Sequence, residues 1–318
     1  MSKQPKILVV GSLVMDLIVG MDRFPTTGET VLGTFFKTAT GGKGANQAVQ
    51  SARLGADVTM VGKVGDDDFG KQLIRAVSEC GVDTTKIKVS KTSSTAIGNI
   101  QIENKNGKAD NRICVVSGAN MDISLDDISF LEKEIADYDM VLLQFEIPME
   151  INMRVAEYAA KKGVPVMLNT APFAPIPKEM LPLLTYVSPN ESEAAAISGI
   201  EIKDAKSADE AIRAITAMGI ENVIITLGSR GAIIGNKNGS TFFPSVEGVT
   251  AVDPTAAGDS FVGAFCTAIC SGYDQSSAME FANATAAITV SRMGAMPSLP
   301  TLKEVKNLQE EIKNGKNA

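Results

Sequence analysis

Short apolar runs alternate with helical patterns along most of the chain. Runs of consecutive apolar residues, typical of strands buried on both faces of a sheet, occupy residues 6–10, 58–61, 140–145, 164–168 and 223–227. Helical periodicity separates most of these runs. In residues 44–54, for example, Ala45, Ala48, Val49 and Ala52 fall on one face of a helix. The alternation predicts an α/β protein, a three-layer αβα sandwich with a mainly parallel central sheet.

Two stretches interrupt this alternation and predict a small β-sheet appendage. Residues 12–39 carry little helical periodicity and contain Pro25 and Gly28. Residues 95–103 and 111–117 flank Asn104-Lys105-Asn106-Gly107, and Asn-Gly is a frequent hairpin turn. We therefore expect residues 12–39 and 94–118 to form a β lid over the main domain. Such a lid would cover the carboxyl ends of the strands, where open α/β sheets bind ligands.

The main domain is then expected to comprise residues 1–11, 40–93 and 119–318. Its last segment, residues 304–316, has the pattern of a charged and mostly solvated helix. A chain of 318 residues can form one large α/β domain with an appendage. No apolar run is long enough to span a bilayer, and the N-terminus passes into a strand without a signal peptide, so we expect a cytoplasmic protein.

Composition excludes several classes of chemistry. The chain contains no histidine, which rules out Ser-His-Asp triads and His-ligated zinc and leaves acid–base work to Asp, Glu, Lys, Tyr or Cys. The net charge of −7, without a basic stripe, argues against a nucleic-acid partner. Cys80, Cys114, Cys266 and Cys270 form no CxxC pair and are expected to be reduced core thiols.

Residues 252–261, VDPTAAGDSF, carry the strongest chemical signal. Phe261 begins a buried helical face, so the residues before it lie where a helix starts. The N–H groups at a helix start attract anions, and the small Ala256, Ala257 and Gly258 would let a phosphate approach them. Asp259 would lie beside that phosphate as a general base, as phosphoryl transfer to a hydroxyl requires. The alternative is that Gly258 and Asp259 only start and cap the helix.

Two further clusters lie where ligands would bind. Gly41-Gly42-Lys43-Gly44-Ala45-Asn46-Gln47 opens a helix, and its glycines would admit a ligand to backbone N–H groups while Lys43 and Asn46 donate hydrogen bonds. It fits neither the P-loop nor the GxGxxG pattern, and a simple helix-start turn is the alternative. Glu146 follows a strand at its carboxyl end, and Asp16 follows the first strand and a short turn at the same end. The alternative for each is an ordinary solvated carboxylate.

Two polar turns follow later strands. Asn190 could cap a helix or, with Glu193, organise Mg²⁺ and its waters beside a nucleotide. The turn Thr226-Leu227-Gly228-Ser229-Arg230-Gly231 could connect two strands, contact ATP phosphates, or do both.

Taken in order, these pieces resemble the ribokinase branch of the phosphofructokinase-B type sugar kinases. The resemblance covers nearly the whole chain and is carried by Gly11-Ser12, Phe24-Pro25, Gly28-Glu29-Thr30, residues 41–49, Gln144-Phe145-Glu146, residues 189–193 and 226–231, residues 253–259, and Gly294-Ala295-Met296-Pro297-Ser298. The last two motifs, in this order and at this separation, are specific. The resemblance implies a ribokinase-like fold with a β lid, homodimers joined through the lids, and transfer of the γ-phosphoryl group of ATP to a sugar hydroxymethyl oxygen.

The resemblance also assigns roles to individual residues. Asp259 is expected to be the base, with Gly258, Ala257 and Ala256 as the anion hole. The expected sugar contacts are Asp16, Val14, Gly41, Gly42, Lys43, Asn46, Glu146 and Asp259. The expected nucleotide contacts are Asn190, Thr226, Gly228, Ser229, Gly231, Gly258 and Asn283, with Mg²⁺ held through water by Glu193. A K⁺ ion is expected beside the anion hole, on the Asp253 side chain, the Ser298 hydroxyl and main-chain oxygens near Thr255, Thr289, Arg292 and Gly294.

One position departs from the pattern of ribose kinases. Those enzymes have Gly-Ser-(apolar)-Asn-x-Asp after the first strand, whereas this chain reads Gly11-Ser12-Leu13-Val14-Met15-Asp16. Valine replaces an amide that would bond a sugar hydroxyl, and the deoxyribokinases also have an apolar residue there. The hypothesis is a 5-kinase for 2-deoxy-D-ribose or D-ribose; the alternatives are another furanose, such as fructose or a nucleoside, or a sugar-binding regulator without turnover.

Overall fold

The computed structural model describes residues 4–105 and 108–315. Within those residues, the main body contains one nine-stranded sheet in the order β13-β12-β11-β10-β9-β8-β1-β4-β5. Its strands are β1 (Lys6–Val10), β4 (Asp57–Gly65), β5 (Ile87–Ser90), β8 (Met140–Leu143), β9 (Val166–Asn169), β10 (Tyr186–Ser188), β11 (Asn222–Thr226), β12 (Gly231–Asn236) and β13 (Gly239–Pro244). All neighbours pair in parallel except β12, which is antiparallel to both β11 and β13.

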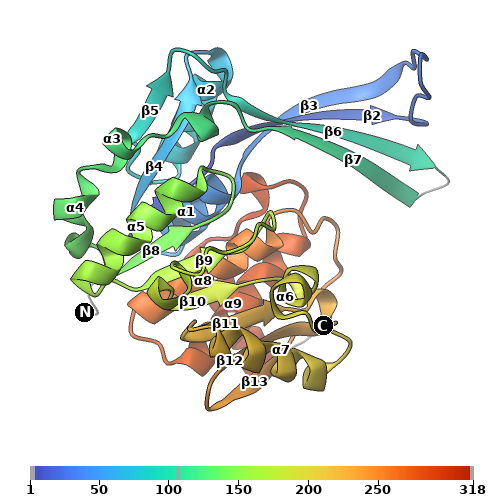
Figure 1. Ribbon diagram of the computed structural model, residues 1–318. Coiled ribbons are helices and arrows are strands. Elements are labelled where there is room, and N and C mark those ends of the chain that lie inside the picture. The colour runs from blue at the N-terminus through green and yellow to red at the C-terminus, as the bar shows by residue number, and fades with distance from the viewer. Residues whose placement is uncertain (1–3, 106–107, 316–318) are drawn as a thin grey trace.

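Helices cover both faces of this sheet (Figure 1). One layer consists of α1 (Lys43–Arg53), α2 (Asp68–Glu79), α8 (Ala257–Cys270), α9 (Gln275–Val290) and α10 (Leu302–Lys313), whose buried side chains join one core. The other layer consists of α3 (Leu125–Ile128), α4 (Leu131–Glu134), α5 (Met149–Lys162), α6 (Glu191–Ser198) and α7 (Ala205–Ala217), which join a second core. The short 3₁₀ turns are η1 (Gly118–Asp122), η2 (Ile135–Asp137), η3 (Leu181–Leu183), η4 (Gly228–Arg230) and η5 (Met296–Ser298).

The central strand β1 is apolar at every buried position because it supplies both cores. In β1, Ile7 and Val9 point into the first core, while Leu8 and Val10 point into the second. All four side chains are fully buried. Successive strand residues point to opposite faces, so a strand between two helical layers must be apolar at every position. This confirms the predicted αβα architecture.

The lid is a separate four-stranded sheet that projects from the main body (Figure 1). It contains β2 (Val14–Met21), β3 (Gly33–Gly41), β6 (Ala96–Lys105) and β7 (Lys108–Val116), in the order β3-β2-β6-β7. β2 is antiparallel to β3 and parallel to β6, and β6 pairs antiparallel with β7. The predicted lid and the two strands of the hairpin are therefore present, although Asn106 and Gly107 of the expected turn lie outside the described residues.

The sheet places the site through its strand order. β1 pairs with β4 on one side and with β8 on the other, so the chain reverses its direction across the sheet at β1. In open α/β sheets, the crevice at such a reversal, at the carboxyl ends of the strands, is where ligands bind. Here Gly11 and Ser12 follow β1, and Gln144 follows β8.

One smaller expectation changed. None of the four cysteines forms a disulfide among the described residues, but Cys114 is exposed on β7 and is no core thiol. Asp16, as expected, follows β1 and a short turn, and it is the third residue of lid strand β2. Among the described helices, none has the length and apolar character needed to cross a membrane.

Candidate active site

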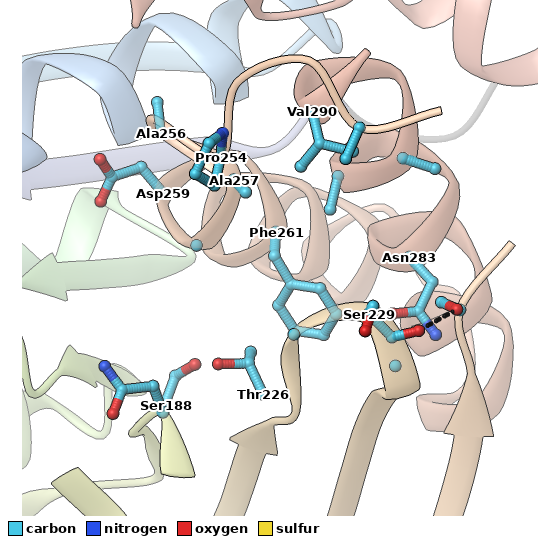
Figure 2. Close-up of a pocket in the computed structure, with 18 of the residues that line it drawn as sticks. Ser188, Thr226, Ser229, Pro254, Ala256, Ala257, Asp259, Phe261, Asn283 and Val290 are labelled. Atoms are coloured by element: carbon cyan, nitrogen blue, oxygen red, sulfur yellow. Dashed lines mark hydrogen bonds between the residues drawn. The ribbon is translucent and has the colours of Figure 1, made fainter. Parts of the chain in front are cut away.

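A cavity of about 660 Å³ runs along the carboxyl ends of β9, β10 and β11 and beneath the start of α8 (Figure 2). The charged residues of its wall are Lys43, Glu191, Glu193 and Asp259. The polar and small residues expected at a nucleotide site also line it: Asn190, Thr226, Gly228, Ser229, Gly231, Ala256, Ala257, Gly258 and Asn283. The cavity therefore brings together residues that lie far apart in the sequence.

The start of α8 presents its backbone to this cavity. Ala256 precedes the helix with φ of 61°, a left-handed conformation that L-residues rarely adopt. A Cβ added to Gly258 would have no neighbouring atom within 4 Å, so open space lies beside this residue. The first N–H groups of a helix have no intrahelical partner and carry the positive end of its dipole, although Ala257 N here donates to Pro254 O in the preceding loop at 3.2 Å. An anion can therefore approach the Ala256–Gly258 segment closely.

Asp259 lies in the first turn of α8, and two amides from α1 hold its carboxylate. Asn46 Nδ2 donates to Oδ2 at 2.9 Å, and Gln47 Nε2 donates to Oδ1 at 3.1 Å. Only 6% of Asp259 is exposed. The carboxylate is thus fixed in orientation at the same cavity wall that carries the open backbone of Gly258.

Lys43 supplies the cation of this region. Burial lowers the pKa of its ammonium group, but the carboxylates of Asp259, Glu146 and Glu193 outweigh that effect and raise the pKa. The backbone N–H of Lys43 donates to Glu146 Oε2 at 3.0 Å, and the Ser12 hydroxyl also donates to this oxygen. Glu146 therefore joins the start of α1 to the end of β1.

Asp16 faces the same region from the lid. Burial, with a further contribution from the nearby Glu146 charge, raises the pKa of Asp16 to about 6. A Cβ added to Gly98 would lie 2.3 Å from Asp16 Oδ1, so the neighbouring strand must have glycine there. Val14 lies two residues earlier on β2, hence on the same face of the lid sheet as Asp16, and is buried.

The glycine turn before α1 is tightly constrained. Gly42 has φ of 97°, and a Cβ there would lie 2.8 Å from Val14 N and 2.9 Å from Ser12 O. Gly41 is the last residue of β3, and a Cβ there would be 3.2 Å from Asp16 Oδ2. Asn46 Oδ1 is buried without a hydrogen-bond partner among the described residues. A buried acceptor of this kind is satisfied when a ligand donates to it.

The far part of the cavity combines caps and turns with an apolar wall. Asn190 caps α6 and forms a reciprocal capping box with Glu193, which also accepts from Thr170 Oγ1 at 2.9 Å. The capping alternative therefore holds, and it leaves both residues on the cavity wall. Asn283 Nδ2 donates to Pro244 O at 3.1 Å. The expected turn between two strands is η4, which connects β11 to β12.

The expected cation ligands cluster around Asp253. Its carboxylate accepts from Thr255 N at 2.9 Å and from Gly294 N at 2.8 Å. Although burial raises the pKa of Asp253, its hydrogen bonds with Thr255 and Gly294 lower it overall. Ser298 Oγ donates to Ala295 O at 2.7 Å.

The remaining expected positions flank this cluster. Thr289 O accepts from Arg292 N at 3.1 Å, and the Arg292 guanidinium pairs with Glu304. Carboxylate and carbonyl oxygens suit a hard cation. Over the described part of the chain, no group of three or more Cys, Asp or Glu side chains is arranged to hold a metal ion.

Sequence reasoning missed several residues of the site. The amide side chain of Gln47 contacts Asp259, and Gln144 Nε2 donates to Gln47 Oε1 at 2.7 Å. The sequence signal for Gln47 was its place beside Asn46 at a helix start. The missed cavity lining is mainly apolar or small: Ala171, Val246, Val249, Ala251, Pro254, Phe261, Ala286, Ala287 and Val290, with the polar Asn169, Ser188 and Ser245.

The chain is similar to known kinases over nearly its whole length. A family model described as pfkB family carbohydrate kinase matches residues 4–302. A ribokinase of Bacillus subtilis is 40% identical over 303 residues, covering 95% of this chain and 98% of the relative. A deoxyribokinase of Salmonella typhi is 32% identical over 299 residues, covering 94% and 96%. Arabidopsis thaliana ribokinase complexed with ribose and ATP has a similar structure, with a TM-score of 0.89, 33% identity, and coverage of 96% and 99%.

Proposed function

The chain belongs to the pfkB family of carbohydrate kinases, and we propose that it transfers the γ-phosphoryl group of ATP to the 5-hydroxymethyl oxygen of a pentose, 2-deoxy-D-ribose or D-ribose. One observation carries this proposal. The carboxylate of Asp259 and the open backbone of Gly258 lie side by side on a single cavity, with the Lys43 ammonium on the same wall. A base, an anion site and a cation at one point are what phosphoryl transfer to an alcohol requires.

In this proposal, Asp259 accepts the proton of the attacking hydroxyl. The oxygen then forms a bond to the γ-phosphorus, the bond from that phosphorus to the bridging oxygen breaks, and ADP leaves. Ala256, Ala257 and Gly258 form the anion hole, whose N–H groups stabilise the charge that develops on the phosphoryl oxygens. The 14-residue α8 adds the positive end of its dipole.

The sugar would occupy the region between α1 and the lid. Asp16 and Glu146 would accept hydrogen bonds from sugar hydroxyls, and the partnerless Asn46 Oδ1 would accept another. Lys43 and the glycines Gly41 and Gly42 would complete the contact. Because β2 and β3 belong to the lid, the sugar would lie where lid and main body meet.

The nucleotide would occupy the remaining length of the cavity. Thr226, Gly228, Ser229 and Gly231 would contact its phosphates, and Asn190 and Asn283 would contact its more distant parts. Val246, Val249, Ala251 and Val290 form an apolar wall suited to a base.

Two cations would support the reaction. Both oxygens of Glu193 already accept hydrogen bonds from Asn190 or Thr170, so Glu193 would hold Mg²⁺ through water. For K⁺, Asp253 keeps spare acceptor capacity, since a carboxylate offers about four lone-pair sites. Bound there, with Ser298 and carbonyl oxygens near Thr255, Thr289, Arg292 and Gly294, K⁺ would stiffen the loop that leads into the anion hole.

We also propose that two copies associate through their lids. The face of the lid that carries Asp16 exposes apolar side chains that a partner sheet would cover: Phe35 on β3 and Ile113 and Val115 on β7 are 36%, 58% and 53% exposed. Apolar side chains gathered on one small sheet are typical of an interaction surface.

Val14 supports the acceptance of a sugar that lacks one hydroxyl. It is buried on the Asp16 face of β2, where an amide would need a hydroxyl partner and valine does not. We expect the wild-type kcat/KM for 2-deoxyribose to lie within about tenfold of that for ribose. Val14→Asn should shift the ratio toward ribose by about tenfold or more. A wild-type preference for ribose of several hundredfold, or a ratio unchanged by Val14→Asn, would contradict this assignment.

A further inference from the structure

Behind the catalytic carboxylate, a chain of buried amides connects three distant segments of the protein. Gln144, just after β8, donates from Nε2 to Gln47 Oε1 at 2.7 Å, and Gln47 on α1 donates from Nε2 to Asp259 Oδ1 at 3.1 Å. Asn152 Nδ2 in turn holds the backbone oxygen of Gln144 at 2.7 Å. Both glutamines are fully buried.

The Asp259 carboxylate at one end sets the donor-to-acceptor direction of both hydrogen bonds in this series of amides. An ionised carboxylate only accepts hydrogen bonds, so Gln47 must turn its NH₂ group toward Asp259. Its oxygen then faces Gln144, which must donate as well. The consequence is visible at the other end, where Gln144 Oε1 is buried with no hydrogen-bond partner among the described residues. A buried acceptor without a partner is costly, yet the opposite orientation would place two amide oxygens against each other.

The two oxygens of Asp259 therefore have different surroundings. Oδ1 is bonded by Gln47, on the fully buried side. Oδ2 accepts a hydrogen bond from Asn46 Nδ2. Asn46 Oδ1 and Asp16 Oδ2 both lie close to Gly41, at 3.9 Å and 3.2 Å from the position that a Cβ would take there. Oδ2 is thus the oxygen on the side where the sugar is proposed to bind.

We propose that Gln47 is a positioning residue, held in turn by Gln144, that fixes Asp259 through Oδ1 and so leaves Oδ2 to receive the proton of the sugar hydroxyl. The inference rests on the proposed function, because it assumes that Asp259 is the base. A carboxylate that can rotate about its Cβ–Cγ bond spends less time in the reactive orientation, and small misplacements of a reacting group reduce rates strongly.

The test compares three glutamine-to-methionine variants, which keep the volume of the side chain and remove its hydrogen bonds. Gln47→Met should lower kcat about 10- to 100-fold while the KM for sugar stays within about threefold. Gln144→Met should lower kcat in the same way and by less, again with the KM for sugar nearly unchanged.

Gln50 offers a matched control on the same helix. It is also a fully buried amide, but it donates to Pro300 O at 3.0 Å, and no hydrogen bond joins it to Asp259 among the described residues. Gln50→Met should lower the melting temperature and leave kcat unchanged. An equal loss of kcat in Gln50→Met would show general loosening of α1 and overturn the inference.

The inference and the proposed function fail differently. Should Asp259→Asn keep its turnover, the assignment of the base is wrong. Should Asp259→Asn be inactive while Gln47→Met shows wild-type kcat, only the positioning role of Gln47 is overturned.

Discussion

Replacing Asp16 by asparagine should make the empty protein more stable at neutral pH. Asp16 is held in a buried position near the charge of Glu146, which raises its pKa to about 6 from an ordinary value of 3.8. The difference of about two pH units corresponds to about 3 kcal/mol, which is the upper limit of the cost of keeping this carboxylate charged in the folded state. Asparagine fills the same space without a charge.

The sign of the effect follows from proton linkage. Between about pH 4 and pH 6, the folded protein binds a proton at Asp16 that the unfolded chain has already lost. Asp16 therefore contributes less stability as the pH rises through this window. We expect Asp16→Asn to exceed the wild type by up to about 3 kcal/mol at pH 7.5 and to match it near pH 4.

Urea unfolding at a series of pH values measures this difference, and Asp67 provides a control of opposite sign. Burial would raise the pKa of Asp67, but hydrogen bonds from Thr95 and Gly70 lower it overall. Asp67→Asn should therefore destabilise the protein at pH 7.5, with a loss that shrinks in acid. The reasoning is refuted if Asp16→Asn is no more stable than the wild type at pH 7.5, or if its advantage is the same at pH 4.

Two further changes have expected outcomes that follow directly from the geometry. Gly42→Ala should lower the free energy of unfolding, measured in urea, by about 1–3 kcal/mol. The φ of 97° at this position is strained for alanine, and the new Cβ would lie 2.8 Å from Val14 N. An unchanged urea midpoint would contradict the observed turn. Asp253→Ala should reduce activation by K⁺ more than it changes sugar affinity. Turnover measured against K⁺ concentration gives the first quantity, and calorimetric sugar binding gives the second. An unaltered K⁺ response would contradict the proposed cation site.

The central sheet and the start of α8 could be predicted because their signals are local. Phe261 and Phe265 follow the periodicity of a buried helical face, and the structure buries both. The run Lys6–Val10 is apolar at every buried position, as a strand between two helical layers must be. Patterns of this kind depend on neighbours within a few residues, and a single sequence contains all of them.

The missing parts of the site depend on contacts between distant segments. Gln47 lies 212 residues from Asp259 and 97 from Gln144, and no spacing rule connects such residues. The surroundings of Asp16 also depend on a distant segment, because its neighbour on the adjacent lid strand is Gly98. The apolar lining around Val246 and Val249 belongs to a loop without periodicity, so only the fold shows that it faces the cavity.

Turnover of Asp259→Asn tests the central claim most directly. With a pentose and ATP at saturating concentrations, the account predicts that kcat falls about 10²- to 10⁴-fold, because the alcohol loses the group that accepts its proton. Calorimetric sugar affinity should stay within a few-fold of the wild type, since Asp16, Asn46 and Glu146 are unchanged. A variant that binds sugar normally and turns over within about threefold of the wild type would contradict phosphoryl transfer at this carboxylate.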